Sequence, residues 1–419
     1  MLTSQVAAIS ALENPNALKV LATLQELGPY KSFESFKAGY DAVQSAGLID
    51  TPQAFDNSDE NFGAMRLGIR GYKIKLVNGC EWSDPLDSLS DSLVLEQCND
   101  PTVDTAISNH KVFVQDFSSM GQYTDSNKTE SKYAPNVVGF FCNNDAKGLL
   151  LPLAIKIVDT GLTYTKEDSA GEWQLAKMAL DATELNFQQV FPLVHTHSLS
   201  IPIRVEMMRS MATEHPIYAL LNYHFFGDIA LEYLGGKVLL SVDTPYDQSM
   251  AFGASGSMRY IYDEFSNTSM KNDFPAEIAR NGLEYLPNHR YVKYGATYYS
   301  VIKTFVTSYV KAATALYNTP LPTEKGVDVD VFDYVIPSDV FPLLSYMAMR
   351  FYRPIPAAKS VLSAYTMSPF SDETVLQDAI AQFQQSMAAM EITVDSIEAE
   401  EKYPVMFVKP SLLPWFSYV

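Results

Sequence analysis

The sequence predicts a mainly α-helical fold with a small, irregular β portion. Apolar residues recur at helical intervals from Trp173 through Leu185, and a second stripe runs through positions 298–316. Apolar positions that repeat every three or four residues place one face of a helix against a core. A third helical pattern covers residues 372–401, whereas residues 72–150 hold only short apolar runs. We therefore expect long helices around a buried centre, with strands confined to the first half of the chain.

The chain has 419 residues, of which 47% are hydrophobic and 12% aromatic. This composition is enough for one large core or for two ordinary ones. No internal repeat, low-complexity tract or long linker divides the chain, so we expect a single domain over residues 1–419. Residues 1–58 form its divergent N-terminal segment, in which the pattern at 16–27 predicts a helix.

Strands or buried extended segments are predicted at the apolar runs 73–77, 112–114 and 137–141. Helices are predicted from Trp173 onward and over residues 298–316, 338–352 and 372–401, with Ser338 as an N-cap. Pro202 and Pro216 are expected to start or kink helices. The tail, residues 403–419, contains three prolines and is expected to be extended and packed.

The formal net charge of −19 argues against a nucleic-acid partner, because such a surface repels polyanions. No segment has the roughly 18 uninterrupted apolar residues that a membrane span needs. The longest candidate, residues 148–158, is too short and contains Pro152 and Lys156. We therefore expect no integral membrane segment.

Three cysteines, Cys80, Cys98 and Cys142, are odd in number and lack the spacing of a metal site. They are interpreted as free thiols in a reducing compartment, which predicts a cytoplasmic protein. The N-terminus lacks the basic start and the long apolar run of a secretory signal. In a chain that is not secreted, the glycosylation sequons at Asn127 and Asn267 are interpreted as chance matches.

Several catalytic motifs are missing from the sequence. It has no Gly-rich phosphate loop, no Gly-x-Ser-x-Gly, no Cys-x-x-Cys and no His-Glu-x-x-His. Hydrolase, kinase and nucleotide-dependent redox functions therefore have no support.

The stretch from Trp173 to His224 carries the most specific pattern in the chain. It reads WQLAKMALDATELNFQQVFPLVHTHSLSIPIRVEMMRSMATEHPIYALLNYH. This stretch resembles the metal-binding core of the lipoxygenases, which are non-haem iron dioxygenases of polyunsaturated fatty acids. The matching positions are Trp173, Ala176, Lys177, Gln188, Thr196, His197, Arg209, His215–Tyr218, Leu220, Leu221 and His224.

The resemblance extends over residues 59–419 in order and spacing. Further matches are Asp59–Gly63 with Leu67, Phe140–Phe141, Leu151–Ile155, Phe274–Ile278 with Arg280 and Gly282, Ile302–Val306 with Tyr309 and Val310, and Pro414–Val419. The resemblance implies a compact catalytic domain without the N-terminal lipid-binding β-sandwich that many members of the family have.

The family's metal ligands are largely replaced in this sequence. The resemblance places the first two ligand histidines at Pro192 and His197, the third at Tyr346 and an asparagine at Arg350. Val419 takes the place of the terminal residue whose carboxylate binds iron. Proline offers no donor to a metal, and the fixed charge of arginine repels a cation. We therefore expect no metal and no other cofactor, and we expect Pro192 to distort its helix.

The other histidines have ordinary roles. His195 and His197 are two residues apart, so on a helix they face different directions and chelate poorly together. The resemblance makes His215 and His224 structural residues. We expect His110 and His289 to be isolated and exposed.

The resemblance also implies a long apolar channel. It places Gln188 near the substrate, Gly235 at the position that steers oxygen and Leu239 at a substrate clamp. Leu239 could equally be a core residue, and Gly235 could belong to a helix end. The expected substrate-binding residues are Phe187, Pro192, Gly235, Leu239, Phe351, Arg353 and Val419.

Three functions stay open. The first is a metal-free enzyme that cyclises or isomerises a linear polyene or another lipophilic substrate, with Tyr346, His197, Arg350 and Gln188 as its catalytic residues. Asp181 or Glu184 could act as an acid or base if turned inward, although both could lie on a solvated helix face. The second is a fatty-acid dioxygenase with a rearranged metal site, and the third is a non-catalytic carrier of a hydrophobic ligand.

Overall fold

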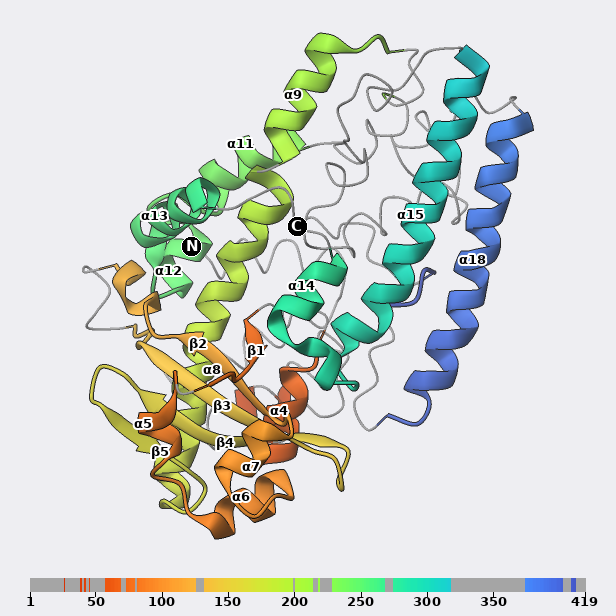
Figure 1. Cartoon of the computed structure of the whole chain (residues 1–419). Coiled ribbons are helices and arrows are strands. Elements are labelled where there is room, and N and C mark those ends of the chain that lie inside the picture. The colour runs from red at the N-terminus through yellow and green to blue at the C-terminus, as the bar shows by residue number, and fades with distance from the viewer. Residues whose placement is uncertain are drawn as a thin grey trace.

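A computed structural model of the chain describes a defined set of residues. These are 57–68, 73–79, 81–125, 132–198, 200–213, 218, 228–267, 274–317, 374–401 and 408–411, with isolated positions between 26 and 45. Four predictions fall outside this set, namely nearly all of the helix at 16–27, the helix at 338–352, the helix start or kink at Pro216 and most of the tail. Within the set, the protein is mainly α-helical with one small antiparallel sheet (Figure 1), which confirms the predicted fold class.

The sheet is an antiparallel meander in which strands that follow one another in sequence are neighbours. Its order is β1 (Ile74–Leu76), β2 (Val112–Phe117), β3 (Val137–Asn144), β4 (Leu149–Ile157) and β5 (Leu162–Tyr164). All three predicted strands are present. The register shifts between Phe140 and Phe141, opposite Pro152 of β4. Proline has no backbone N–H to donate, so a sheet accommodates it at an irregularity of this kind.

Alternation along β2 buries both faces of the sheet. Val112 and Val114 belong to one core cluster, whereas Phe113 and Phe117 belong to another. The first face packs against α6 (Asp91–Cys98), which contacts β3 and β4. The second face packs against α4 (Asp59–Met65) and α8 (Ala170–Pro192). Two short helices, α5 (Ser83–Leu86) and α7 (Val103–Ser108), complete this end of the molecule.

The long helix α8 leads from the sheet into the helical part of the protein (Figure 1). It begins with a capping box, in which Ser169 and Glu172 each accept a hydrogen bond from the other's backbone N–H. A π-helical turn, η2 (Leu193–Ser198), follows directly and connects to α9 (Ser200–Ser210). Pro202 therefore lies in the first turn of α9, as predicted, where its missing N–H costs little.

Several short helices and turns complete the described part of the chain. They are the 3-10 turns η1 (Met120–Tyr123) and η3 (Leu283–Tyr285) and the helices α11 (Asp228–Val238), α12 (Pro245–Ser249), α13 (Gly253–Asn267) and α14 (Phe274–Asn281). Among them, α13 contacts both α8 and η2. Helix α13 therefore packs against the π-helical turn as well as against α8.

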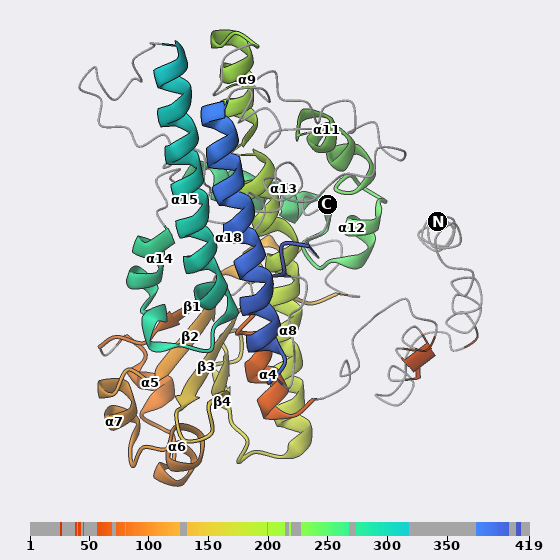
Figure 2. The same cartoon turned by 90° about the vertical axis from the view of Figure 1, so that its right-hand side faces the viewer.

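Helices α15 (Arg290–Tyr317) and α18 (Thr374–Glu398) lie side by side in both views (Figures 1 and 2). The predicted helix at 298–316 lies within α15, and α18 covers most of the predicted helix at 372–401. Phe305 of α15 packs against Phe383 of α18 with ring centroids 4.8 Å apart. Residues 408–411 of the tail dock here, because the hydroxyl of Tyr298 donates a hydrogen bond of 2.5 Å to the carbonyl of Val408. Val408 is fully buried, in line with the predicted packing of the tail.

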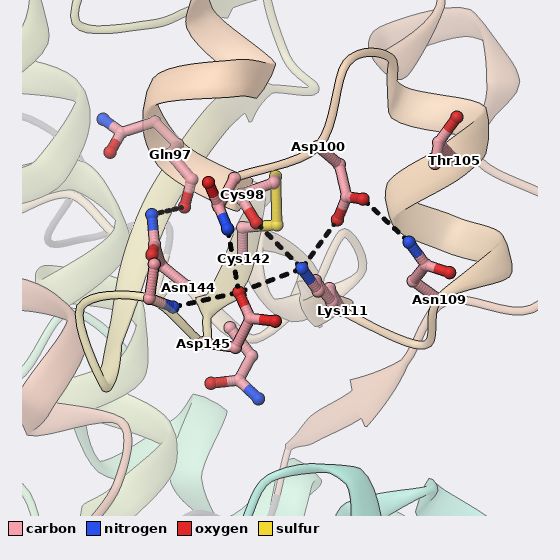
Figure 3. Close-up of polar contacts among 12 residues, drawn as sticks. Gln97, Cys98, Asp100, Thr105, Asn109, Lys111, Cys142, Asn144 and Asp145 are labelled. Atoms are coloured by element: carbon pink, nitrogen blue, oxygen red, sulfur yellow. Dashed lines mark hydrogen bonds and ion pairs between the residues drawn. A yellow bond between two sulfur atoms is a disulfide. The ribbon is translucent and has the colours of Figure 1, made fainter.

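A disulfide joins Cys98 to Cys142, so the prediction of three free thiols is wrong. Cys98 ends α6, which lies on the sheet, and Cys142 belongs to β3 beneath it. Their Cα atoms are 5.2 Å apart, which is within the range that a disulfide requires. The sequence did not indicate this pair, because the two cysteines are separated by 44 positions and no local pattern connects them. Figure 3 shows the bond among a group of polar side chains.

Lys111 organises these polar contacts (Figure 3). Its Nζ lies 2.9 Å from Asp100 Oδ2 and 3.0 Å from Asp145 Oδ1, and it donates to the Cys98 carbonyl at 3.3 Å. Burial alone would lower the pKa of Lys111, but the hydrogen bonds with the two carboxylates outweigh it and raise the pKa. Asn109 donates to the other oxygen of Asp100 at 2.7 Å. The segment between the cysteines is thus fixed by both a covalent bond and charged contacts.

None of the helices in the described ranges is long and apolar enough to cross a membrane.

Candidate functional site

The candidate site lies where α8 ends. Pro192 is the last residue of α8, and the chain continues into the π-helical turn η2. Proline cannot donate the hydrogen bond to the carbonyl four residues earlier, and its ring crowds the preceding turn. A π-helical turn begins directly after Pro192, and such turns are frequent at functional sites. The distortion that Pro192 predicted is therefore confirmed.

An aromatic stack follows one side of α8 into the π-helical turn. Phe187 is fully buried, and its ring centroid lies 4.8 Å from that of Phe191. Phe191 stacks in turn on His195 at 4.1 Å. Phe187 also packs against Phe117 of the sheet at 5.5 Å. Residues four apart share a helix face, so this apolar column connects the sheet core to η2.

His195 and Glu264 form a polar contact inside this apolar surrounding. His195 is only 5% exposed, and its Nε2 lies 2.8 Å from Oε1 of Glu264 on α13. The hydroxyl of Tyr260 donates to the other carboxylate oxygen at 3.3 Å. Burial and the nearby charge of Glu264 raise the pKa of Tyr260, so this hydroxyl stays protonated. Sequence reasoning missed the contact, because nothing in the local pattern pairs residues 69 positions apart.

Asp181 and Glu184, the two carboxylates considered as acids or bases, face a buried arginine. Nη2 of Arg66 lies 2.6 Å from Asp181 Oδ1 and 3.2 Å from Glu184 Oε2. Gln115 joins them, since it accepts from Arg66 Nε at 3.2 Å and donates to Glu184 at 3.1 Å. The Arg66 guanidinium also lies 3.9 Å from the centre of the Phe62 ring. This network binds α4 to α8 and gives both carboxylates a structural role.

Trp173 and Lys177, which carry part of the family pattern, also hold α8 against α4. The indole N–H of Trp173 donates to Asp59 Oδ1 at 2.9 Å. Lys177 Nζ donates to the same oxygen at 2.9 Å and to the carbonyl of Asn57 at 2.7 Å. Trp173 and Lys177 therefore have a structural role, which is to hold α8 against α4.

Gly63, in the matched Asp59–Gly63 segment, allows α4 to touch the sheet. A Cβ atom at this position would lie 1.8 Å from the carbonyl oxygen of Leu150. No side chain fits at that distance, so only glycine permits this approach of helix to strand.

The second half of the candidate site is α11, which contacts η2 and α9. Gly235 lies in its last turns, and no atom lies within 4 Å of the position that a Cβ would take there. Leu239 follows the helix and is 39% exposed. Partial desolvation raises the pKa of the Glu232 carboxyl, and a hydrogen bond with Ser198 of η2 opposes the rise. The roles of Gly235 and Leu239 toward a substrate stay predictions.

The other expected site residues differ in how far the structure describes them. Gln188 is half-buried on α8, and the backbone of His197 belongs to η2, whereas the His197 side chain lies outside the description. Outside it altogether are Tyr346, Arg350, Phe351, Arg353, Val419, His215 and His224. Their assignments stay predictions.

The described residues do not make a metal site. In the part of the chain that the structure describes, no three His, Cys, Asp or Glu side chains gather at one point. The side chain of Pro192, at the first expected ligand position, has no donor atom for a metal. The side chain of His197 and the residues Tyr346 and Val419, at the other expected ligand positions, lie outside the described residues, so the absence of a metal stays a prediction.

The two remaining histidines differ from each other. His110 is exposed and stacks on Tyr285 with centroids 4.3 Å apart, so its predicted exposure is confirmed. His289 is fully buried, so the prediction that it is exposed is wrong. It directly precedes α15, where the backbone N–H of Arg290 donates to the Leu67 carbonyl at 2.8 Å and ties this junction to the end of α4.

Comparison with known proteins places this geometry in a family. Residues 60–317 match the family model described as Lipoxygenase. The manganese lipoxygenase of Fusarium oxysporum (strain Fo5176) is 25% identical over 305 residues, which are 70% of this chain and 49% of that protein. The linoleate 9/13-lipoxygenase of Pseudomonas aeruginosa is 25% identical over 213 residues, which are 46% of this chain and 30% of that protein.

The fold agrees with these matches. The solved manganese lipoxygenase of Gaeumannomyces graminis superposes with a TM-score of 0.73 at 17% identity, covering 99% of this chain and 88% of that one. The chain spans about half the length of the Fusarium relative that it matches. Because the family model covers well over half of the sequence, the protein belongs to the lipoxygenase family.

Proposed function

We propose that the protein is an enzyme that binds a linear lipophilic molecule, a polyene or a fatty-acid-like chain, beside the π-helical turn and cyclises or isomerises it without a metal. The observation that carries this proposal is Pro192 at the junction of α8 and η2. A residue without a metal donor stands there, and the described side chains around it are aromatic. Such a site favours a function based on the shape of an apolar channel.

The replacement set supports the absence of a metal. Pro192 is not the only replacement: Tyr346 takes the position of the third ligand histidine, and Arg350 takes the position of the asparagine. A tyrosine phenolate binds metals, but the guanidinium of Arg350 stays charged and repels a cation. It would instead hydrogen-bond an anion such as the carboxylate of Val419. Pro192, Tyr346 and Arg350 thus replace most of the side-chain metal ligands that the family uses.

Catalysis would depend on holding the substrate in a reactive conformation, since orientation alone supplies several kcal/mol of a barrier. Tyr346 would donate a proton or a hydrogen bond, and His197 would act as acid or base. Arg350 would stabilise negative charge, while Gln188 would orient the substrate. The channel would be lined by Phe187, Pro192, Gly235, Leu239, Phe351, Arg353 and Val419, within a single domain over residues 1–419.

A second candidate is a fatty-acid dioxygenase with a rearranged metal site. The 25% identity to a protein named manganese lipoxygenase favours it, as does the similarity to one named for linoleate. His197, the Tyr346 phenolate and the Val419 carboxylate would then be the ligands. A third candidate is a carrier that binds the same ligand without turning it over.

Elemental analysis separates the first two candidates. The full-length protein is purified without added metal, its iron and manganese are measured per chain, and its turnover of a linear polyene fatty acid is measured with and without a chelator. The proposal predicts far less than one metal per chain and turnover that the chelator does not change. Stoichiometric metal, with activity lost to the chelator, would establish the dioxygenase instead. Binding without turnover would establish the carrier.

A Tyr346→Phe variant tests the mechanism within the same assay. If Tyr346 donates to the reacting substrate, turnover falls at least about tenfold while the thermal unfolding temperature stays nearly unchanged. Unchanged turnover would remove Tyr346 from the mechanism.

A further inference from the structure

We propose that this chain matures in an oxidising compartment and that Asn267 is a site of N-linked glycosylation there. The proposal is independent of the reaction at the candidate site. It rests on the buried disulfide between Cys98 and Cys142 and on the exposed position of Asn267 at the end of α13.

The disulfide belongs to the core of the sheet end. Both cysteines are completely buried, within the cluster that α6 forms with β3 and β4. Reagents in solution reach buried sulfur atoms poorly, so the bond forms while the chain folds rather than by later oxidation of the surface. The loop it closes contains α7, β2 and η1. The Lys111 contacts with Asp100 and Asp145 lie directly beside it (Figure 3).

Formation of this bond needs an oxidant. The two thiols lose two protons and two electrons, and a thiol–disulfide oxidoreductase takes the electrons as its own disulfide is reduced to a dithiol. Secretory compartments supply such oxidants, whereas the cytosol keeps protein thiols reduced. The expectation of a cytoplasmic protein rested on three free thiols and on an N-terminal sequence unlike a secretory signal, and the disulfide removes the first of these supports.

In an oxidising compartment of the secretory route, the sequon at Asn267 gains significance. The sequence there is Asn267-Thr268-Ser269, which fits the acceptor pattern for N-linked glycans. Its interpretation as a chance match assumed a chain that is not secreted. Asn267 is exposed and is the last residue of α13, whose neighbouring side chains Phe265 and Ser266 are exposed as well. A bulky sugar therefore has room on this surface.

The local hydrogen bond is compatible with the modification. Nδ2 of Asn267 donates to the carbonyl of Asp263, four residues earlier in α13, at 2.7 Å. Glycan transfer forms a bond from Nδ2 to the first sugar carbon of a lipid-linked oligosaccharide, whose bond to the diphosphate breaks. The diphosphate leaves with the electron pair, and Nδ2 loses one proton. The second N–H remains and keeps the bond to Asp263.

The test uses the full-length protein isolated from the cells that make it. Free thiols are alkylated under denaturing conditions without reductant, and the digest is analysed by mass spectrometry before and after enzymatic removal of N-glycans. We expect one alkylated cysteine per chain, a linked peptide pair containing Cys98 and Cys142, and a glycopeptide containing Asn267. Three alkylated cysteines would overturn the oxidising compartment. An unmodified Asn267 peptide would overturn the glycan site.

Variants made in a secretory eukaryotic host provide the matched controls. Ser269→Ala keeps Asn267 and its contact with Asp263 but destroys the sequon, so the glycan at Asn267 should disappear. Asn127→Gln removes the other sequon and should leave the Asn267 glycan in place. A glycan at Asn267 that persists in the Ser269→Ala protein would contradict attachment through this sequon.

Discussion

His195 Nε2 lies 2.8 Å from Glu264 Oε1, and this contact ties the π-helical turn to α13 within the protein. The ring of His195 is held from a second side by Phe191. A hydrogen bond and an aromatic stack thus help to fix the turn that carries the backbone of His197. Its geometry depends on a helix 69 residues further along the chain.

The first prediction concerns the coupling of these two side chains. A double-mutant cycle with His195→Phe and Glu264→Met should give a coupling free energy of about 1–2 kcal/mol, because each single change leaves the remaining side chain without this partner. Urea unfolding of the four proteins measures it. Tyr260→Phe, which removes only the 3.3 Å contact, should cost less than His195→Phe. A coupling indistinguishable from zero would show that the contact does not hold the turn.

The second prediction concerns Arg66, whose side chain is completely buried between α4, the sheet and α8. Arg66→Met should lower the free energy of unfolding by about 3 kcal/mol, because Asp181 and Glu184 then face each other without a cation. Lys166→Gln is the control, since it breaks an exposed pair with Glu96 and should change stability by less than about 1 kcal/mol. Equal effects of the two substitutions would refute the structural role of Arg66.

The third prediction compares two glycines. Gly63→Ala should destabilise the protein by about 3 kcal/mol or more, because its Cβ would collide with the backbone of Leu150 and neither chain segment can move far. At Gly171, in the first turn of α8, no atom lies within 4 Å of the position that a Cβ would occupy. Gly171→Ala should leave stability unchanged or raise it by about 0.5 kcal/mol. Thermal unfolding distinguishes these cases, and a tolerant Gly63 would mean that α4 does not press on β4.

The fourth prediction is a pH dependence at Tyr246. Burial raises the pKa of its hydroxyl to about 12, although a hydrogen bond with Ser257 opposes the shift. In the unfolded chain this hydroxyl ionises near pH 10, its usual value. Between pH 10 and about 12 the unfolded state therefore loses the proton while the folded state keeps it. The free energy of unfolding should fall across this window.

Tyr246→Phe isolates this contribution. The variant should be less stable than the parent at pH 7 by about 1 kcal/mol, because it lacks the hydrogen bond to Asn186. Between pH 10 and 12, the free energy of unfolding should fall less for the variant than for the parent, and the difference should be roughly 2 kcal/mol. Tyr262→Phe serves as control, since Tyr262 is 72% exposed. Parallel pH curves for Tyr246→Phe and the parent would contradict the prediction.

Local patterns predicted several of the strands and the long helices, although they did not predict β4. The apolar runs gave the strands β1, β2 and β3, and the apolar stripes gave α15 and α18. The Ser169 capping box is visible in the sequence as Ser-x-x-Glu before an apolar run, so the start of α8 could have been placed from it. These features are readable because the residues that determine them are close together in the chain.

Contacts between distant segments could not be predicted in the same way. The Cys98–Cys142 bond, the Arg66 network and the His195–Glu264 contact each join residues 44 or more positions apart. A carboxylate such as Asp181 looks solvated on its own helix until the arginine that faces it is known. Likewise His289 has no local apolar pattern, yet the start of α15 buries it. At the candidate site, Pro192 alone predicted its consequence, because the effect of proline on a helix is local.

Oxygen uptake measured together with substrate consumption tests the proposed function most directly. The purified full-length protein is given a linear polyene fatty acid in air-saturated buffer, and both quantities are followed in the same vessel. A metal-free cyclase or isomerase consumes the substrate while the oxygen concentration stays constant. Consumption of one oxygen molecule for each substrate molecule would contradict the account and identify a dioxygenase.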